Sequence, residues 1–183
     1  HTPESVQQYI QMAEGFDGKE LIEELKKILP AKSVLLELGS GPGTDWNILK
    51  ETYEVSGSDF SREFLKRLET ANPDGSFLEL NAVTLKTDKT FDGIYSNKVL
   101  HHLTDTELRA SVKRQAEILN SGGIICHSFW KGEESETYEG MLVNYHTNEE
   151  LPGFFQNSFD ILLLEEYKEF EDNDSILLLA RKR

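Results

Sequence analysis

The chain has 183 residues, 38% hydrophobic and 28% charged, a composition typical of a soluble globular domain and not of a disordered one. Its 19 basic and 33 acidic residues give a net charge of −14, which disfavours a nucleic-acid partner because such a surface repels phosphates. No apolar run approaches the length of a membrane span and no signal peptide is visible, so we expect a cytoplasmic protein with no membrane partner.

The length predicts one domain over residues 1–183, with N-terminal helices in residues 1–30 and a core over 31–183. The only cysteine, Cys126, stands in an apolar run and is expected to be a small buried residue in a reducing compartment. Cysteines and histidines nowhere show the spacing of metal ligands, so the sequence predicts no metal site.

Two helices are expected before the first strand. Thr2-Pro3-Glu4 combines an N-cap residue, a first-turn proline and an acid that complements the helix dipole, which predicts a helix to about Ala13. A second helix over 19–29 has apolar residues on one face and ends at Pro30.

The first strand, residues 34–38, stops at the glycine cluster 39–43, and a helix over 44–52 follows. This strand–turn–helix pattern indicates a nucleotide-type cofactor site, although a tight turn without a ligand gives the same pattern. Glu37 lies near the end of the buried strand, where a carboxylate is costly unless a cation or several donors meet it. An acid beside a diphosphate is unfavourable, so a ligand with an ammonium and a sulfonium fits this turn better.

A second strand over 53–59 ends at Asp59. The separation from Gly41 is 59 − 41 = 18 residues, near the roughly 20 expected between a glycine turn and a ribose-binding carboxylate. The alternative is that Asp59 caps the next helix. The other expected elements are a helix over 61–71, strands over 76–80 and 91–97, a helix over 105–120, a strand over 124–130, a polar acidic loop over 131–145, a short helix ending by 157, and two strands over 159–170 and 175–180 joined by a hairpin turn.

Two motifs carry a resemblance to a known family. The run Glu37-Leu-Gly39-Ser-Gly41-Pro-Gly43 resembles the first motif of class I S-adenosylmethionine-dependent methyltransferases, and residues 91–103, FDGIYSNKVLHHL, resemble the fourth. The resemblance covers residues 33–181 and is closest to small enzymes of the "methyltransferase type 11" kind. It implies an α/β, doubly wound, Rossmann-like sheet of seven strands in the order 3-2-1-4-5-7-6, the last antiparallel, with helices on both faces.

The resemblance also implies S-adenosylmethionine as cofactor and assigns roles to particular residues. Asp59 would bind the ribose and Phe60 would lie against the adenine, while the Asn81 carbonyl would accept from the adenine amine unless Asn81 is a loop or cap residue. Asn97 and Lys98 would lie beside the methionine part, through backbone as much as side chain. The complete implied set is Glu37, Gly39, Ser40, Gly41, Gly43, Asp59, Phe60, Asn81, Ala82, Asn97 and Lys98.

Methyl transfer from a sulfonium is an in-line displacement that depends on proximity, and only a hydroxyl or carbon acceptor needs a strong base. Candidates for a base are His101, its neighbour His102 and His127, although a strand histidine is more often a core residue. Tyr9 is a candidate lid residue or a core residue. Only the N-terminal helices and the 131–145 loop could form an acceptor site, so we expect a small-molecule acceptor.

Two alternatives remain open from the sequence. One is an NAD-dependent oxidoreductase, against which stand Glu37 and the presence of Thr44 where the third glycine of G-x-G-x-x-G belongs. The other is a catalytically idle, cofactor-binding partner subunit. The sequence assigns no oligomeric state.

Overall fold

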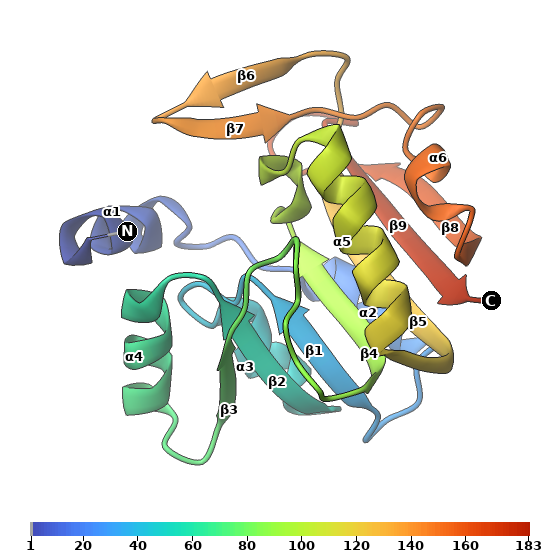
Figure 1. Ribbon diagram of the computed structural model, residues 1–183. Coiled ribbons are helices and arrows are strands. Elements are labelled where there is room, and N and C mark those ends of the chain that lie inside the picture. Colours follow the sequence, from blue (N-terminus) through green and yellow to red (C-terminus); the bar gives the residue numbers. More distant parts are fainter. Residues whose placement is uncertain (1) are drawn as a thin grey trace.

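The computed structural model describes residues 2–183 and contains one seven-stranded sheet with helices on both faces (Figure 1). The strand order is β3-β2-β1-β4-β5-β9-β8, and only β9 runs antiparallel to its neighbours. This order confirms the predicted topology, since β9 and β8 are the seventh and sixth strands of this sheet. The strands are β1 (Val34–Leu38), β2 (Glu54–Asp59), β3 (Ser76–Glu79), β4 (Phe91–Asn97), β5 (Leu119–Trp130), β8 (Phe159–Tyr167) and β9 (Ser175–Lys182).

Successive side chains of a strand point to opposite faces of the sheet, and in the central strands the side chains on both faces are mostly apolar. Helices therefore cover both faces. In β1, Leu35 packs into a cluster with α2 and α3, and Leu36 packs into a second cluster with α5 and α6. In Figure 1, α5 and α6 lie in front of the sheet and α2 and α3 behind it. The helices are α1 (Pro3–Met12), α2 (Lys19–Lys26), α3 (Thr44–Leu49), α4 (Arg62–Ala71), α5 (Asp105–Ile118), α6 (Pro152–Phe155) and the short 3₁₀ turn η1 (Leu100–His102).

Residues 131–145, predicted to be a loop, contain a hairpin of β6 (Ser135–Tyr138) and β7 (Met141–Asn144) above the sheet (Figure 1). Glu139 and Gly140 turn it with φ angles of 48° and 79°, the left-handed geometry of a two-residue hairpin turn. All four residues of β6 are exposed, so no apolar alternation marked this strand in the sequence. The prediction of a loop was therefore wrong.

The end of β8 also differs from its predicted position. The strand stops at Tyr167 instead of residue 170, because the Asp174 carboxylate accepts hydrogen bonds from the backbone N–H groups of Glu169, Phe170 and Glu171. These bonds lower the pKa of Asp174 to about 2 and form a side-chain-capped turn before β9. Among residues 2–183, no helix is both long and apolar enough to cross a bilayer.

Candidate functional site

The turn after β1 uses glycine for two separate reasons. Gly39, Gly41 and Gly43 have φ angles of 66°, 50° and 87°, a region that residues with a Cβ rarely adopt. A Cβ on Gly39 would lie 2.6 Å from the Val99 side chain, whereas one on Gly41 would meet no atom nearer than Tyr9 Cε1, at 3.8 Å. A Cβ on Gly41 would therefore make only an ordinary van der Waals contact, with the Tyr9 ring that lies over this backbone.

Glu37 is buried at the end of β1, with 3% of its surface exposed. Its carboxylate accepts a hydrogen bond from Ser40 Oγ at 2.6 Å, and Ser40 Oγ in turn accepts from the backbone of Ser58 at 3.1 Å. Burial raises the pKa of Glu37 to about 8, and the negative charges of Asp45 and Asp59 add to this effect. Within residues 2–183, no lysine, arginine or histidine forms an ion pair with Glu37.

Asp59 joins the end of β2 to the glycine turn. One carboxylate oxygen accepts from the Gly41 N–H at 3.0 Å and the other from the Ser61 N–H at 2.8 Å. Burial raises the pKa of Asp59, although the backbone hydrogen bonds oppose this shift. The backbone of Phe60 is a further donor to this carboxylate, and the Phe60 ring is 69% exposed. The structure brings Glu37 and Asp59 together, since parallel strands β1 and β2 end at one edge.

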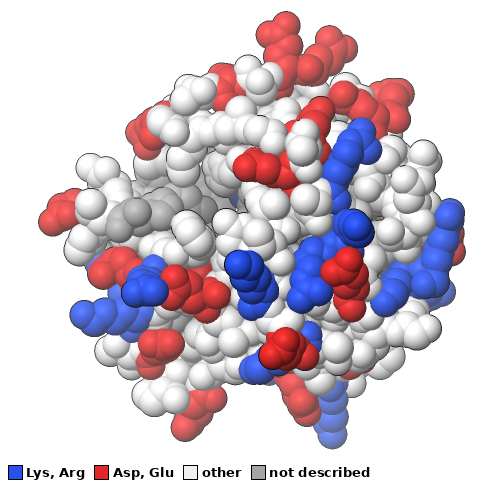
Figure 2. All heavy atoms as spheres, viewed as in Figure 1, with Lys and Arg blue, Asp and Glu red and all other residues white. Residues whose placement is uncertain are grey.

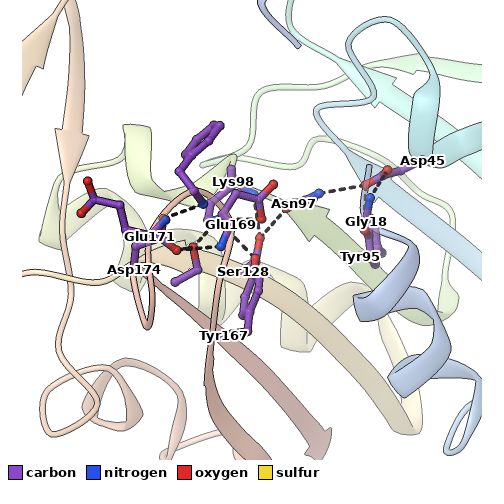
Figure 3. Close-up of polar contacts among 12 residues, drawn as sticks. Gly18, Asp45, Tyr95, Asn97, Lys98, Ser128, Tyr167, Glu169, Glu171 and Asp174 are labelled. Atoms are coloured by element: carbon purple, nitrogen blue, oxygen red, sulfur yellow. Dashed lines mark hydrogen bonds and ion pairs between the residues drawn. The ribbon is translucent and has the colours of Figure 1, made fainter. Parts of the chain in front are cut away.

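Asp45, in the first turn of α3, connects three parts of the chain (Figure 3). One oxygen accepts from the Gly18 N–H at 2.7 Å, and the other accepts from Tyr95 Oη at 2.7 Å and Asn97 Nδ2 at 3.1 Å. A Cβ on Gly18 would overlap Tyr95 Oη. Sequence analysis missed Asp45, because an acid in a first helical turn is a common dipole preference and its three partners lie 27 to 52 residues away.

Asn97 and Lys98 extend this polar network along the carboxyl edge of the sheet. Ser128 Oγ donates to Asn97 Oδ1 at 2.6 Å and accepts from the Lys98 N–H at 2.9 Å. The Lys98 backbone, with φ of 53°, lies beside Asn97, but its side chain turns toward the ends of β8 and β9 (Figure 3). The ammonium donates to Ser175 Oγ at 2.9 Å and to Tyr167 Oη at 3.2 Å.

Aromatic and acidic groups enclose the Lys98 ammonium. Its nitrogen lies 3.7 Å from the centre of the Trp130 ring and 3.5 Å from a carboxylate oxygen of Glu169. Burial lowers the pKa of Lys98 to about 8, although the negative charges of Glu169 and Asp174 oppose the shift. Beside Asn97, therefore, only the backbone of Lys98 is available to contact a ligand. Nothing in the sequence indicated the distant residues that the Lys98 side chain contacts.

Asn81 and Ala82 form the turn after β3. Asn81 Oδ1 accepts from the N–H groups of Val83 at 2.8 Å and Thr84 at 3.2 Å, and the Ala82 carbonyl accepts from Ser111 Oγ at 2.6 Å. The side-chain carbonyl that was expected to accept from an adenine amine already accepts from two backbone N–H groups. This geometry matches the alternative in which Asn81 is a loop residue. Its amide nitrogen is the group left for a ligand.

The candidate histidines have different surroundings. His127 is fully buried between Ser96 Oγ and Gln115 Oε1, each 2.7 Å from a ring nitrogen, and burial lowers its pKa to about 3. Both of its nitrogens are occupied, so the structure favours a core role over the catalytic one considered from the sequence. His101 is 4% exposed and its ring centre lies 3.9 Å from that of His102, while burial lowers its pKa to about 2. His101 Nδ1 has no hydrogen-bond partner among the residues described.

Comparisons with known proteins add the family. Residues 35–123 match the family model described as "Methyltransferase domain". An uncharacterized methyltransferase of Anoxybacillus flavithermus (strain DSM 21510 / WK1) is 30% identical over 139 residues, which are 72% of this chain and 63% of that protein. Together with the sheet order, these matches support a class I methyltransferase. The chain spans less than two thirds of the length of that curated relative.

Solved structures of methyltransferases share the fold. An S-adenosylmethionine-dependent methyltransferase from Clostridium acetobutylicum ATCC 824 has a TM-score of 0.80 at 13% identity, over 96% of this chain and 98% of that one. A second similar structure is the Burkholderia thailandensis 1,6-didemethyltoxoflavin-N1-methyltransferase with bound 1,6-didemethyltoxoflavin and S-adenosylhomocysteine. Its TM-score is 0.77 at 18% identity, over 98% of this chain and 85% of that one. The methyltransferase family match runs from β1 to the first residues of β5 and so includes the glycine turn, Asp59 and Asn97.

Proposed function

We propose that this chain binds S-adenosylmethionine at the glycine turn and transfers its methyl group to a small-molecule acceptor. The observation that carries the proposal is electrostatic. The carboxylates of Asp45 and Asp59 surround the turn together with the carboxyl group of Glu37, which a bound cation would help to ionise. Among residues 2–183 no basic side chain is paired with any of these three groups. A diphosphate would be repelled there, whereas the ammonium and sulfonium of S-adenosylmethionine would be attracted.

The described residues fit such a ligand. The lack of a side chain at Gly41 would let a ligand approach the backbone beside the Tyr9 ring, and the Asp59 carboxylate at the end of β2 suits a ribose hydroxyl. The exposed ring of Phe60 suits the adenine, and the raised pKa of Glu37 indicates a carboxyl that gains from a nearby cation. When bound, the cofactor supplies an electrophilic methyl group. The chain would hold it and its acceptor in line and exclude water.

For the chain organisation we propose a single methyltransferase domain, residues 1–183, in which residues 1–30 cover the site that 31–183 form. The Tyr9 ring packs edge-on against Phe64 of α4, with centres 5.7 Å apart, and Arg67 of α4 donates to Gln7 at 3.1 Å. Burial raises the pKa of Tyr9, and the negative charges of Asp59 and Asp45 raise it further, which is consistent with a hydroxyl beside the turn. These contacts support α1 as a cover.

A small acceptor is supported by the limited room for recognition, since among residues 2–183 the elements beyond the carboxyl edge of the sheet are short, the N-terminal segment and the β6–β7 hairpin being the most extended (Figure 1). On the face in Figure 2, acidic side chains gather at the hairpin end, and basic ones elsewhere lie among acids and form no continuous basic surface. The Burkholderia relative was solved with a small heterocyclic acceptor. Nothing in the comparisons supports an NAD-dependent oxidoreductase or an idle partner subunit.

Calorimetry with S-adenosylmethionine, S-adenosylhomocysteine and NAD⁺ tests the cofactor. We expect heat from the first two and none from NAD⁺, and the reverse pattern would refute the proposal. Release of S-adenosylhomocysteine across a panel of amine, thiol and phenol acceptors then tests transfer. Binding without any turnover over a broad panel would favour the idle subunit.

A further inference from the structure

Three aromatic rings from distant parts of the chain form a continuous row, here called the aromatic stack: Phe16, Phe170 and Trp130. Phe170 lies parallel to Trp130, with an interplanar angle of 15° and centres 5.6 Å apart, and Phe16 meets Phe170 edge-on at 4.7 Å. Phe16 precedes α2, Phe170 belongs to the turn between β8 and β9, and Trp130 ends β5.

Both ends of the aromatic stack are attached to the candidate site. At one end, Phe16 stands two residues before Gly18, whose N–H is held by Asp45 directly after the glycine turn. At the other end, the ammonium of Lys98 lies on the Trp130 face, and the Lys98 backbone follows Asn97. The stack is therefore fixed beside the carboxyl edge at which β4 and β5 end.

The exposure of these rings is not what core packing would produce. Phe16 is 43% exposed and Phe170 is 57% exposed, although each packs against another ring. Trp130 is enclosed by the Lys98 ammonium and by Phe170, so the aromatic surface open to a ligand belongs to the two phenylalanines. Exposed aromatic groups gathered beside a polar site are typical of a binding surface.

Two charged groups that touch the stack or its turn are already occupied inside the protein. The Lys98 ammonium is paired with Glu169 at 3.5 Å and hydrogen-bonded to two hydroxyls. The Asp174 carboxylate accepts from three backbone N–H groups. A ligand on this surface would therefore be held by contact with the rings, not by Lys98 or Asp174, which favours a flat ring that continues the row.

We propose that the aromatic stack is the acceptor wall and that the acceptor carries a flat aromatic or heteroaromatic ring. This inference rests on the proposed methyl transfer and adds the substrate class. Lys98 is a positioning residue here, because its ammonium holds Trp130, and through it Phe170, at a fixed place beside Asn97.

The test uses quinoline as a flat ring that is uncharged at neutral pH and cyclohexylmethylamine as an aliphatic cation of similar size. Ligand-observed NMR titrations are done on the full chain saturated with S-adenosylhomocysteine, after calorimetry has measured that nucleoside's own binding. We expect quinoline to bind and the amine to bind at least about tenfold more weakly. Phe170→Ala and Phe16→Ala should each weaken quinoline about fivefold, which corresponds to about 1 kcal/mol for one ring pair.

Leu162→Ala is the matched control, because Leu162 is 41% exposed on β8 and lies outside the stack, and it should leave quinoline binding unchanged. Quinoline binding that both phenylalanine variants leave intact, or amine binding as tight as quinoline binding, overturns the inference. So does a dimer that sedimentation detects and Phe170→Ala dissociates, since the stack would then be a subunit interface. Absence of S-adenosylhomocysteine binding would instead refute the proposed function.

Discussion

The raised pKa of Glu37 predicts that cofactor binding releases a proton. With a pKa of about 8, about nine tenths of the Glu37 carboxyls are protonated at pH 7, since the ratio of protonated to ionised forms is about ten. A bound cation favours the ionised form, so binding at this pH should release about 0.9 proton per chain. If only the ionised form binds, affinity should fall about fiftyfold from pH 8, where about half is ionised, to pH 6, where about 1% is.

Calorimetry of S-adenosylmethionine binding in two buffers with different ionisation enthalpies measures the released proton directly. Glu37→Gln is the control, because it keeps the hydrogen bond from Ser40 but cannot ionise, and it should show no proton release. Equal heats in both buffers, with an affinity independent of pH, would refute this reasoning.

The same shift has a consequence for the unliganded protein. The folded state holds the Glu37 proton more tightly than the unfolded state does. Protonated Glu37 therefore contributes to the free energy of unfolding, and this contribution is fully present below the ordinary pKa of 4.5. The contribution is lost as the pH rises to about 8. The free energy of unfolding measured in urea should therefore fall over this pH range, and Glu37→Gln should not show this fall.

Three further substitutions test individual parts of the site. Asp59→Ala should weaken S-adenosylhomocysteine binding more than tenfold, the loss expected for charge-assisted hydrogen bonds worth about 1.5–3 kcal/mol, and an unchanged affinity measured by calorimetry would refute the ribose role. Gly41→Val should abolish the binding heat by placing a branched side chain where the ligand would approach the backbone, at a backbone strain of about 1–2 kcal/mol, while circular dichroism still shows the fold. His127→Ala should lower the free energy of unfolding by about 1–3 kcal/mol, because Ser96 and Gln115 lose their partner, yet leave nucleoside affinity within about twofold; unaltered stability in urea would contradict the core role.

Local sequence patterns predicted much of the fold and part of the site. The order of the strands was implied by the family resemblance that two motifs carry. The structure brings Glu37 and Asp59 to one edge because they lie at the ends of neighbouring parallel strands. The interactions of Asp45 were not predictable, since its partners Gly18, Tyr95 and Asn97 carry no pattern that links them to it. The sequence of β6, which has no apolar alternation, likewise gave no sign of a strand, because all four of its side chains are exposed.

The direction of the Lys98 side chain was also beyond sequence reasoning. Its backbone adopts a left-handed φ of 53° directly after β4, a conformation that residues other than glycine adopt rarely. That geometry carries the ammonium to Trp130 and Ser175, which become neighbours only when β9 pairs with β5. The contacts of the Lys98 side chain therefore depend on the pairing of β5 with β9, which the motif around Lys98 does not predict.

The shared carboxylate of Asp45 limits how freely the N-terminal segment could be exchanged between relatives. A chimera that imports a foreign segment must bring a residue without a side chain at position 18, because any Cβ there would overlap Tyr95 Oη. It must also present a backbone donor at that point, or one oxygen of Asp45 loses its only direct partner. Exchange of this segment could therefore change the substrate range only if the new segment has a glycine before α2 whose N–H donates to Asp45.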